Sequence, residues 1–103
     1  MLPPGVGAVG ALLTADGAVG TSGSPTVVWS ITVFADATAT FVLRNGTDTS
    51  GTAFWGPETA AAVVGARHYP FPNGMFFPLG CFFDETAGAA SVAITYNQFP
   101  FTS

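Results

Sequence analysis

The chain has 103 residues, a length that predicts a single domain, and only 8% of them are charged, against roughly 25% in ordinary soluble domains. Lysine is absent, Arg44 and Arg67 are the only basic residues, and the formal net charge is −4. Because nucleic-acid binding depends on basic side chains that neutralise phosphates, this composition argues against a nucleic-acid partner.

The chain holds more large apolar side chains than one small core can bury. Apolar residues make up 49% of it, including ten Phe, two Trp and two Tyr. A domain of this size buries only about two thirds of the surface that its unfolded chain exposes. We therefore expect part of the apolar area to lie in contacts with other chains; a monomer with an apolar surface is the alternative.

The first predicted element is a Gly-rich strand or extended arm at Val6–Thr14. Pro3 and Pro4 interrupt the apolar start and no basic residue precedes it, so we do not interpret it as a cleaved signal peptide. No apolar run approaches the roughly 20 residues of a membrane span, and no membrane partner is expected.

Two β-prone segments follow, Val27–Ala35 and Thr38–Arg44, joined by a tight turn at Asp36–Ala37. Period-two alternation predicts which side chains share a face. In the first segment these are Trp29, Ile31 and Val33 on one face and Ser30, Thr32 and Phe34 on the other. In the second they are Ala39, Phe41 and Leu43 on one face and Thr38, Thr40, Val42 and Arg44 on the other.

A polar loop, Asn45–Gly51, separates the second strand from the next one, Thr52–Trp55. Asn-Gly is a strong hairpin signal, and Asn45-Gly46-Thr47 also matches the acceptor pattern for N-glycosylation. We interpret it as a turn.

The second half of the chain predicts further short elements separated by Gly and Pro. They are at most one helical turn at Ala60–Val64, an edge strand at Ala66–Phe71 ended by Pro70 and Pro72, a strand at Phe76–Phe83, a turn at Glu85–Ala90 and a strand at Ser91–Asn97 with Val92, Ile94 and Tyr96 on one face. About seven to eight short strands predict an all-β fold, an antiparallel β-sandwich or a jelly-roll-like barrel. The whole chain, 1–103, is expected to be one β domain with an extended arm at 1–10 and a tail at 97–103.

No residue pattern indicates catalysis, a metal or a cofactor, so we expect no enzyme. His68 is the only histidine and has no acid near it in sequence, so we interpret it as a surface residue. One His and one Cys cannot form a zinc site within one chain, and Cys81 lies in an apolar run typical of a buried residue. Asp84 and Glu85 match no calcium loop and are expected to be acidic turn residues.

Four segments carry a resemblance to a known group of proteins. They are DGAVG at 16–20, FVLRNGTDTSGTAFW at 41–55, FFPLGCFF at 76–83 and TAGAASVAITY at 86–96. In this order they resemble small β-sandwich virion proteins of tailed bacteriophages, which have a Gly-rich first strand, a Gly-containing hairpin and an alternating closing strand. The segments ARHYPFPNGMFF (66–77) and QFPFTS (98–103) depart from that pattern.

The resemblance implies a capsid-associated role, that of a cement or decoration protein on the head. Its partner would be the major capsid protein, its location the capsid surface of a virion made in the host cytoplasm, and its oligomer a trimer. A tail fibre, spike or head–tail connector component is the alternative, which would present an aromatic patch around Trp55 or Tyr69 to a glycan.

The residues expected at a partner or oligomer interface are large apolar side chains in the arm, the tail and the aromatic segments. They are Leu2, Pro3, Pro4, Trp55, Tyr69, Phe71, Phe99 and Phe101. An arm and a tail of this kind either reach neighbouring chains or pack on their own domain, and the sequence leaves both possibilities open.

Overall fold

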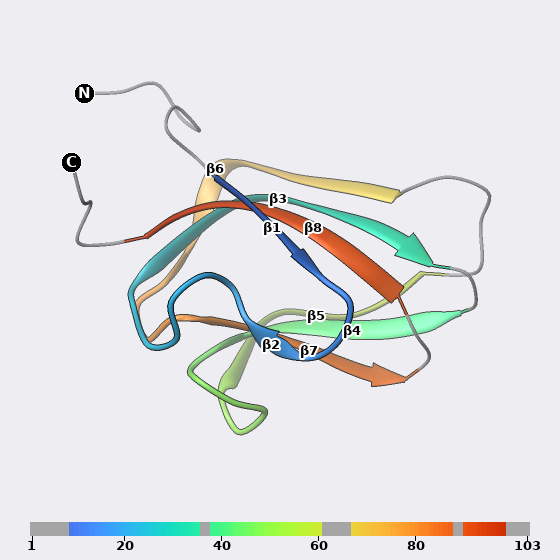
Figure 1. The fold of residues 1–103 in the computed structure, drawn as a ribbon, viewed down its shortest axis with the longest axis horizontal. Helices are drawn as coiled ribbons and strands as arrows, with labels where there is room; N and C mark the ends of the chain where they lie inside the picture. Colours follow the sequence, from blue (N-terminus) through green and yellow to red (C-terminus); the bar gives the residue numbers. More distant parts are fainter. Residues whose placement is uncertain (1–8, 36–37, 61–66, 88–89, 99–103) are drawn as a thin grey trace.

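The computed structural model describes residues 9–35, 38–60, 67–87 and 90–98. These residues form eight β-strands and no helix, arranged as two four-stranded antiparallel sheets that pack face to face (Figure 1). The expected all-β class and antiparallel β-sandwich are therefore confirmed. No helix in the described ranges is long and apolar enough to cross a membrane.

The strand order within each sheet follows a simple rule. Sheet A contains, in spatial order, β1 (Val9–Leu13), β8 (Ala90–Gln98), β3 (Thr26–Ala35) and β6 (Arg67–Phe77). Sheet B contains β2 (Gly17–Ala18), β7 (Cys81–Ala87), β4 (Ala39–Asn45) and β5 (Thr52–Ala60). The first strand pairs with the eighth, the second with the seventh, the third with the sixth and the fourth with the fifth, which is the strand order of a jelly roll.

The core lies between the two sheets, where the inward positions of both meet. Its buried residues are Val19, Val28, Ile31, Val33, Ala39, Phe41, Leu43, Phe77, Cys81, Phe83, Val92 and Ile94. The faces predicted for β4 and β8 are confirmed, because alternate residues of both strands enter this cluster. Cys81 is buried as expected, and burial raises the pKa of its thiol above the ordinary value.

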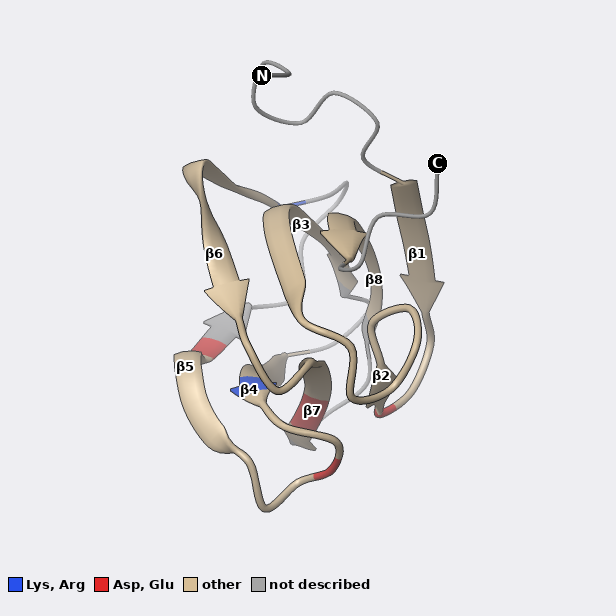
Figure 2. Cartoon of the chain, turned by 90° about the vertical axis from the view of Figure 1, so that its left-hand side faces the viewer, with Lys and Arg blue, Asp and Glu red and all other residues tan. Residues whose placement is uncertain are grey.

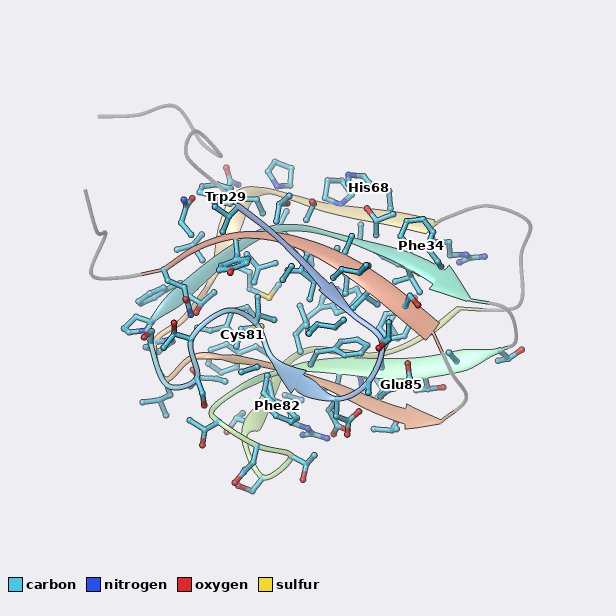
Figure 3. All side chains as sticks on the ribbon, in the orientation of Figure 1. Trp29, Phe34, His68, Cys81, Phe82 and Glu85 are labelled. Atoms are coloured by element: carbon cyan, nitrogen blue, oxygen red, sulfur yellow. The ribbon has the colours of Figure 1, made fainter. Side chains whose placement is uncertain are left out.

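Trp29 does not share the core face of Ile31 and Val33, and that prediction is wrong. The register of β3 shifts between Val28 and Ser30 against both neighbouring strands, and Val28 is fully buried in its place. Such a bulge adds one residue to the strand and reverses the alternation before it. Figure 3 accordingly shows the Trp29 side chain on the side of sheet A that faces away from sheet B.

The boundaries around β6 and β7 also differ from the prediction. One strand, β6, runs through Pro70 and Pro72 to Phe77, so Phe76–Phe83 is not a single strand. The amide nitrogen of Gly80 donates a hydrogen bond to the carbonyl oxygen of Phe77 (3.1 Å) and closes a turn before β7 begins. β6 lies at the edge of sheet A, which confirms the position expected from the prolines. An edge strand has one side on which a missing N–H breaks no ladder bond.

The bounds of several other predicted elements also differ from those of the observed strands. β5 continues beyond the expected Thr52–Trp55 to Ala60, β7 and β8 take most of the expected turn at 85–90, and β2 was not predicted. β1 includes residues 9 and 10 of the expected arm, and β8 includes residues 97 and 98 of the expected tail. The Asp36–Ala37 turn and residues 61–64 of the expected helical turn lie outside the described residues.

Candidate interaction surface

Three of the predicted interface residues form one aromatic cluster. The ring centroid of Trp55, on β5, lies 5.2 Å from that of Tyr69 and 5.7 Å from that of Phe71, both on β6, in edge-to-face geometry. β5 and β6 are edge strands of different sheets and lie on the same side of the sandwich (Figure 2). The cluster therefore joins the two sheets at this side.

The aromatic cluster also packs against the core of the domain. The ring of the fully buried Phe41 lies 5.7 Å from Trp55 and 6.3 Å from Tyr69, and all three cluster residues are partly buried against the core. This geometry gives Trp55 and Tyr69 a packing role within the domain, and their role at an interface stays a prediction. The remaining predicted interface residues lie outside the described part of the chain: Leu2, Pro3, Pro4, Phe99 and Phe101.

The charged residues are distributed unequally between the two sheets. Figure 2 shows β1, β3 and β8 without acidic or basic residues, whereas β4, β5, β7 and the loops beside them carry most of them. Within the described ranges, the only charged residue on a strand of sheet A is Arg67, at the start of β6. The others lie on sheet B or in loops: Asp16, Arg44, Asp48, Glu58, Asp84 and Glu85.

The prediction that Asp84 and Glu85 are turn residues is wrong, because β7 continues through both. The Asp84 carboxylate is buried and pairs with Arg44, with 2.8 Å between Oδ2 and Nε. Nη1 of Arg44 also donates to the carbonyl oxygen of Gly51 (3.1 Å), which ties the loop after β4 to the strand. No group of three or more His, Cys, Asp or Glu residues that could hold a metal ion exists within the described ranges.

The outer face of sheet A, the one turned away from sheet B, is built from cross-strand rows. Because residues directly opposite each other in antiparallel strands share a face, the register defines these rows. One row is Gly10, Thr95, Ser30 and Pro70, and the next is Leu12, Ala93, Thr32 and His68. Further along, Ser91 lies opposite Phe34, and at the other end Val27 lies between Asn97 and Phe76.

The polar side chains on this face bond to one another. The hydroxyls of Ser30 and Thr95 share a hydrogen bond across β3 and β8. The Thr32 hydroxyl bonds Nδ1 of His68 (2.8 Å) across β3 and β6. At the bulge, Nε1 of Trp29 donates to Oδ1 of an asparagine on β8 (2.7 Å).

Large apolar side chains are exposed among these polar pairs. Leu12 is 69% exposed, Phe76 51% and Phe34 46%. Figure 3 shows Phe34 and His68 on the same outer side of sheet A as Trp29. Depletion of charged residues together with exposed aromatic side chains is the compositional signal of the centre of a protein interface.

Sequence reasoning missed this face because it depends on which strands share a sheet. A signal was present, since the segments that form β1, β3 and β8 contain no charged residue, while those that form β4, β5 and β7 do. Charge alone would not have assigned every strand, because β6 in sheet A carries Arg67 and β2 in sheet B carries no charge.

No protein-family model, no curated protein and no solved structure matches the chain. The resemblance to small virion proteins therefore stays an interpretation of the sequence. A proposal for the function has to start from the surface of the chain itself.

Proposed function

We propose that the chain is a capsid cement or decoration protein of a bacteriophage, which binds the lattice of the major capsid protein and stabilises it. The observation that carries the proposal is the outer face of sheet A, which exposes Leu12, Phe34 and Phe76. It holds no charged residue of the described ranges, because Arg67 lies opposite the inward-facing Val33. The segment resemblance supports the same role. The jelly-roll strand order adds a fold-level analogy, since viral capsid domains are among the proteins built this way.

The physical reason is the small desolvation penalty of this face. Burying a charge in an interface requires a partner of opposite sign, and burying a lone polar group costs roughly 1–3 kcal/mol. Here Ser30 shares a hydrogen bond with Thr95, and Thr32 with His68, so each of these side chains already has one partner within the sheet. This lowers the number of hydrogen bonds that a partner has to supply when it covers the face.

Stabilisation of the shell follows from mass action. A ligand that binds the assembled lattice, and not free or unfolded subunits, shifts the equilibrium toward the lattice. Self-association adds avidity, because several linked copies bind several lattice sites. The trimer implied by the resemblance would act in this way, with the arm and the tail, Phe99 and Phe101 included, reaching neighbouring subunits.

The first experiment is quantitative mass spectrometry of purified particles, which gives the copy number of this chain relative to the major capsid protein. A ratio near that of the shell subunits supports the decoration role. A copy number at the level of one tail would favour the fibre, spike or connector alternative. Absence from the particle would contradict both.

A matched pair of variants tests the face itself. Thr95→Lys places a charge in the middle of the outer face of sheet A, and Thr52→Lys makes the same change at an exposed position of β5 in sheet B. We expect Thr95→Lys to reduce the affinity for particles at least about tenfold, a change of about 1.4 kcal/mol, while Thr52→Lys stays near the parent value. Equal affinity of the two variants would rule out this face as the docking surface.

A further inference from the structure

The four edge strands of the sandwich are not equally protected against pairing with another chain. β6 carries Pro70 and Pro72 and a register shift, β5 carries Pro57 and register shifts, and β2 has only two residues. Prolines, bulges and short length are the usual devices that prevent an edge strand from adding a neighbour. Three of the four edges therefore carry such a device.

β1 carries none of them. Its five residues, VGALL, include no proline and no charge, and they pair with β8 in unbroken register from Val9 opposite Tyr96 to Leu13 opposite Val92. β8 occupies one side of β1, and no other described strand pairs with it. The backbone N–H and C=O groups on the free side are a template for a further strand.

The side chains of β1 fit a second copy of β1 in antiparallel pairing. With Ala11 opposite Ala11, Leu12 of one copy lies opposite Gly10 of the other, on the same face of the sheet. Leu12 is 69% exposed, and a Cβ built on Gly10 would meet no atom within 4 Å. The exposed leucine of each copy therefore meets open space beside the glycine of its partner.

We propose that two copies of the chain pair through β1 and join their two A sheets into one continuous sheet. The contact is two-fold symmetric, because each copy offers the same five residues. It brings no charged strand residues together, although each chain has a net charge of −4. It also places the two outer faces of sheet A side by side, so that a partner meets a surface of twice the width.

This pairing belongs to the chain alone, so it can hold or fail whether or not the chain binds a capsid. It makes a dimer, or a multiple of a dimer, and differs in this respect from the trimer that the resemblance implies.

The test is sedimentation equilibrium of the purified full-length chain at concentrations from about 1 μM to about 1 mM, the range of Kd expected for a small contact. Two variants act on the contact: Leu12→Lys adds a charge to it, and Gly10→Lys places a charge beside the leucine of the partner copy. Leu79→Lys is the control, because Leu79 is 61% exposed and lies in the turn between β6 and β7.

We expect the parent chain and Leu79→Lys to show the mass of a dimer or a multiple of it as concentration rises. Leu12→Lys and Gly10→Lys should both raise the dissociation constant at least about tenfold while keeping the β-sheet circular dichroism of the parent. A Cβ at residue 10 meets no atom within 4 Å in the single chain, so loss of the dimer in Gly10→Lys with unchanged circular dichroism is a loss of the contact. A parent that stays monomeric over the whole range, or an oligomer, a trimer included, that neither variant weakens, overturns the proposal.

Discussion

The Tyr69 hydroxyl is buried beside the rings of Phe41 and Trp55, and it has no hydrogen-bond partner among the described residues. A buried hydroxyl without a partner lowers stability, because it has lost its bonds to water. We expect Tyr69→Phe to raise the free energy of unfolding by about 1 kcal/mol, measured by urea denaturation. Tyr96→Phe, also next to the core, is the control and should change it by less than about 0.5 kcal/mol. A loss of stability in Tyr69→Phe would show that the hydroxyl does have a partner.

At the scale of single residues, the sequence predicted which side chains are buried better than it predicted which face of the sheet they lie on. Cys81 and the alternate residues of β4 and β8 were placed correctly, because period-two alternation and an apolar surrounding are local properties. Trp29 was not, since the bulge before Ser30 arises from pairing with two other strands and leaves no mark in its own segment. Trp55, Tyr69 and Phe71 were singled out as a group, but their inward packing against Phe41 depends on how β5 and β6 meet.

At the scale of elements, one amide on β8 holds the segment between β2 and β3. Oε1 of Gln98 accepts a hydrogen bond from the backbone nitrogen of Thr21 (2.9 Å). Its Nε2 shares two hydrogens among three acceptors, the carbonyl oxygens of Val19 (3.1 Å) and Thr21 (2.9 Å) and the hydroxyl oxygen of Thr26 (3.0 Å). The end of β8 is thereby attached to the segment that crosses from sheet B to sheet A.

Gln98→Glu keeps the shape of this side chain and removes its N–H donors. The carboxylate then faces two carbonyl oxygens without a hydrogen to share, and we expect the free energy of unfolding to fall by about 2 kcal/mol. Asn73→Asp, at an exposed position of β6, is the matched control and should change stability by less than about 0.5 kcal/mol. Chemical denaturation at neutral pH measures both, and equal stabilities would mean that the Gln98 bonds contribute nothing net.

The existence of most strands was predictable, and their ends were not. Val27–Ala35 and Ser91–Asn97 match β3 and β8 within a residue at each end, because both are β-prone and alternate. The end of β6 could not be predicted from Pro70 and Pro72, because the strand tolerates both at the edge of its sheet.

At the scale of the whole molecule, the chain divides into a nearly uncharged layer and an acidic one. If the outer face of sheet A is the docking surface, its contacts contain no ion pairs that salt could screen. We expect attachment to particles to persist from about 0.1 M to about 1 M NaCl, a change that shortens the Debye length from about 10 Å to about 3 Å. Co-sedimentation with particles at each salt concentration measures this. Release of the protein at high salt would point instead to the acidic residues of sheet B.

The sequence alone could not predict which strands pair with each other. Seven or eight strands allow many sheet orders, and only the hairpin of β4 and β5 joins neighbours in the sequence within one sheet. The face that we propose as a docking surface combines β1 from the start of the chain with β8 from its end. The absence of charge in each segment is visible in the sequence, but only the strand pairing shows that these segments form one face.

The separation of charge between the sheets also bears on the electrophoresis of any particle that the chain coats. A copy attached through sheet A turns sheet B, with Asp48, Glu58 and the residues around them, toward the solvent. The exterior of the coated particle would then take on the sign of this chain, whose pI is about 4.2, and its migration toward the anode would depend on occupancy more than on the shell beneath.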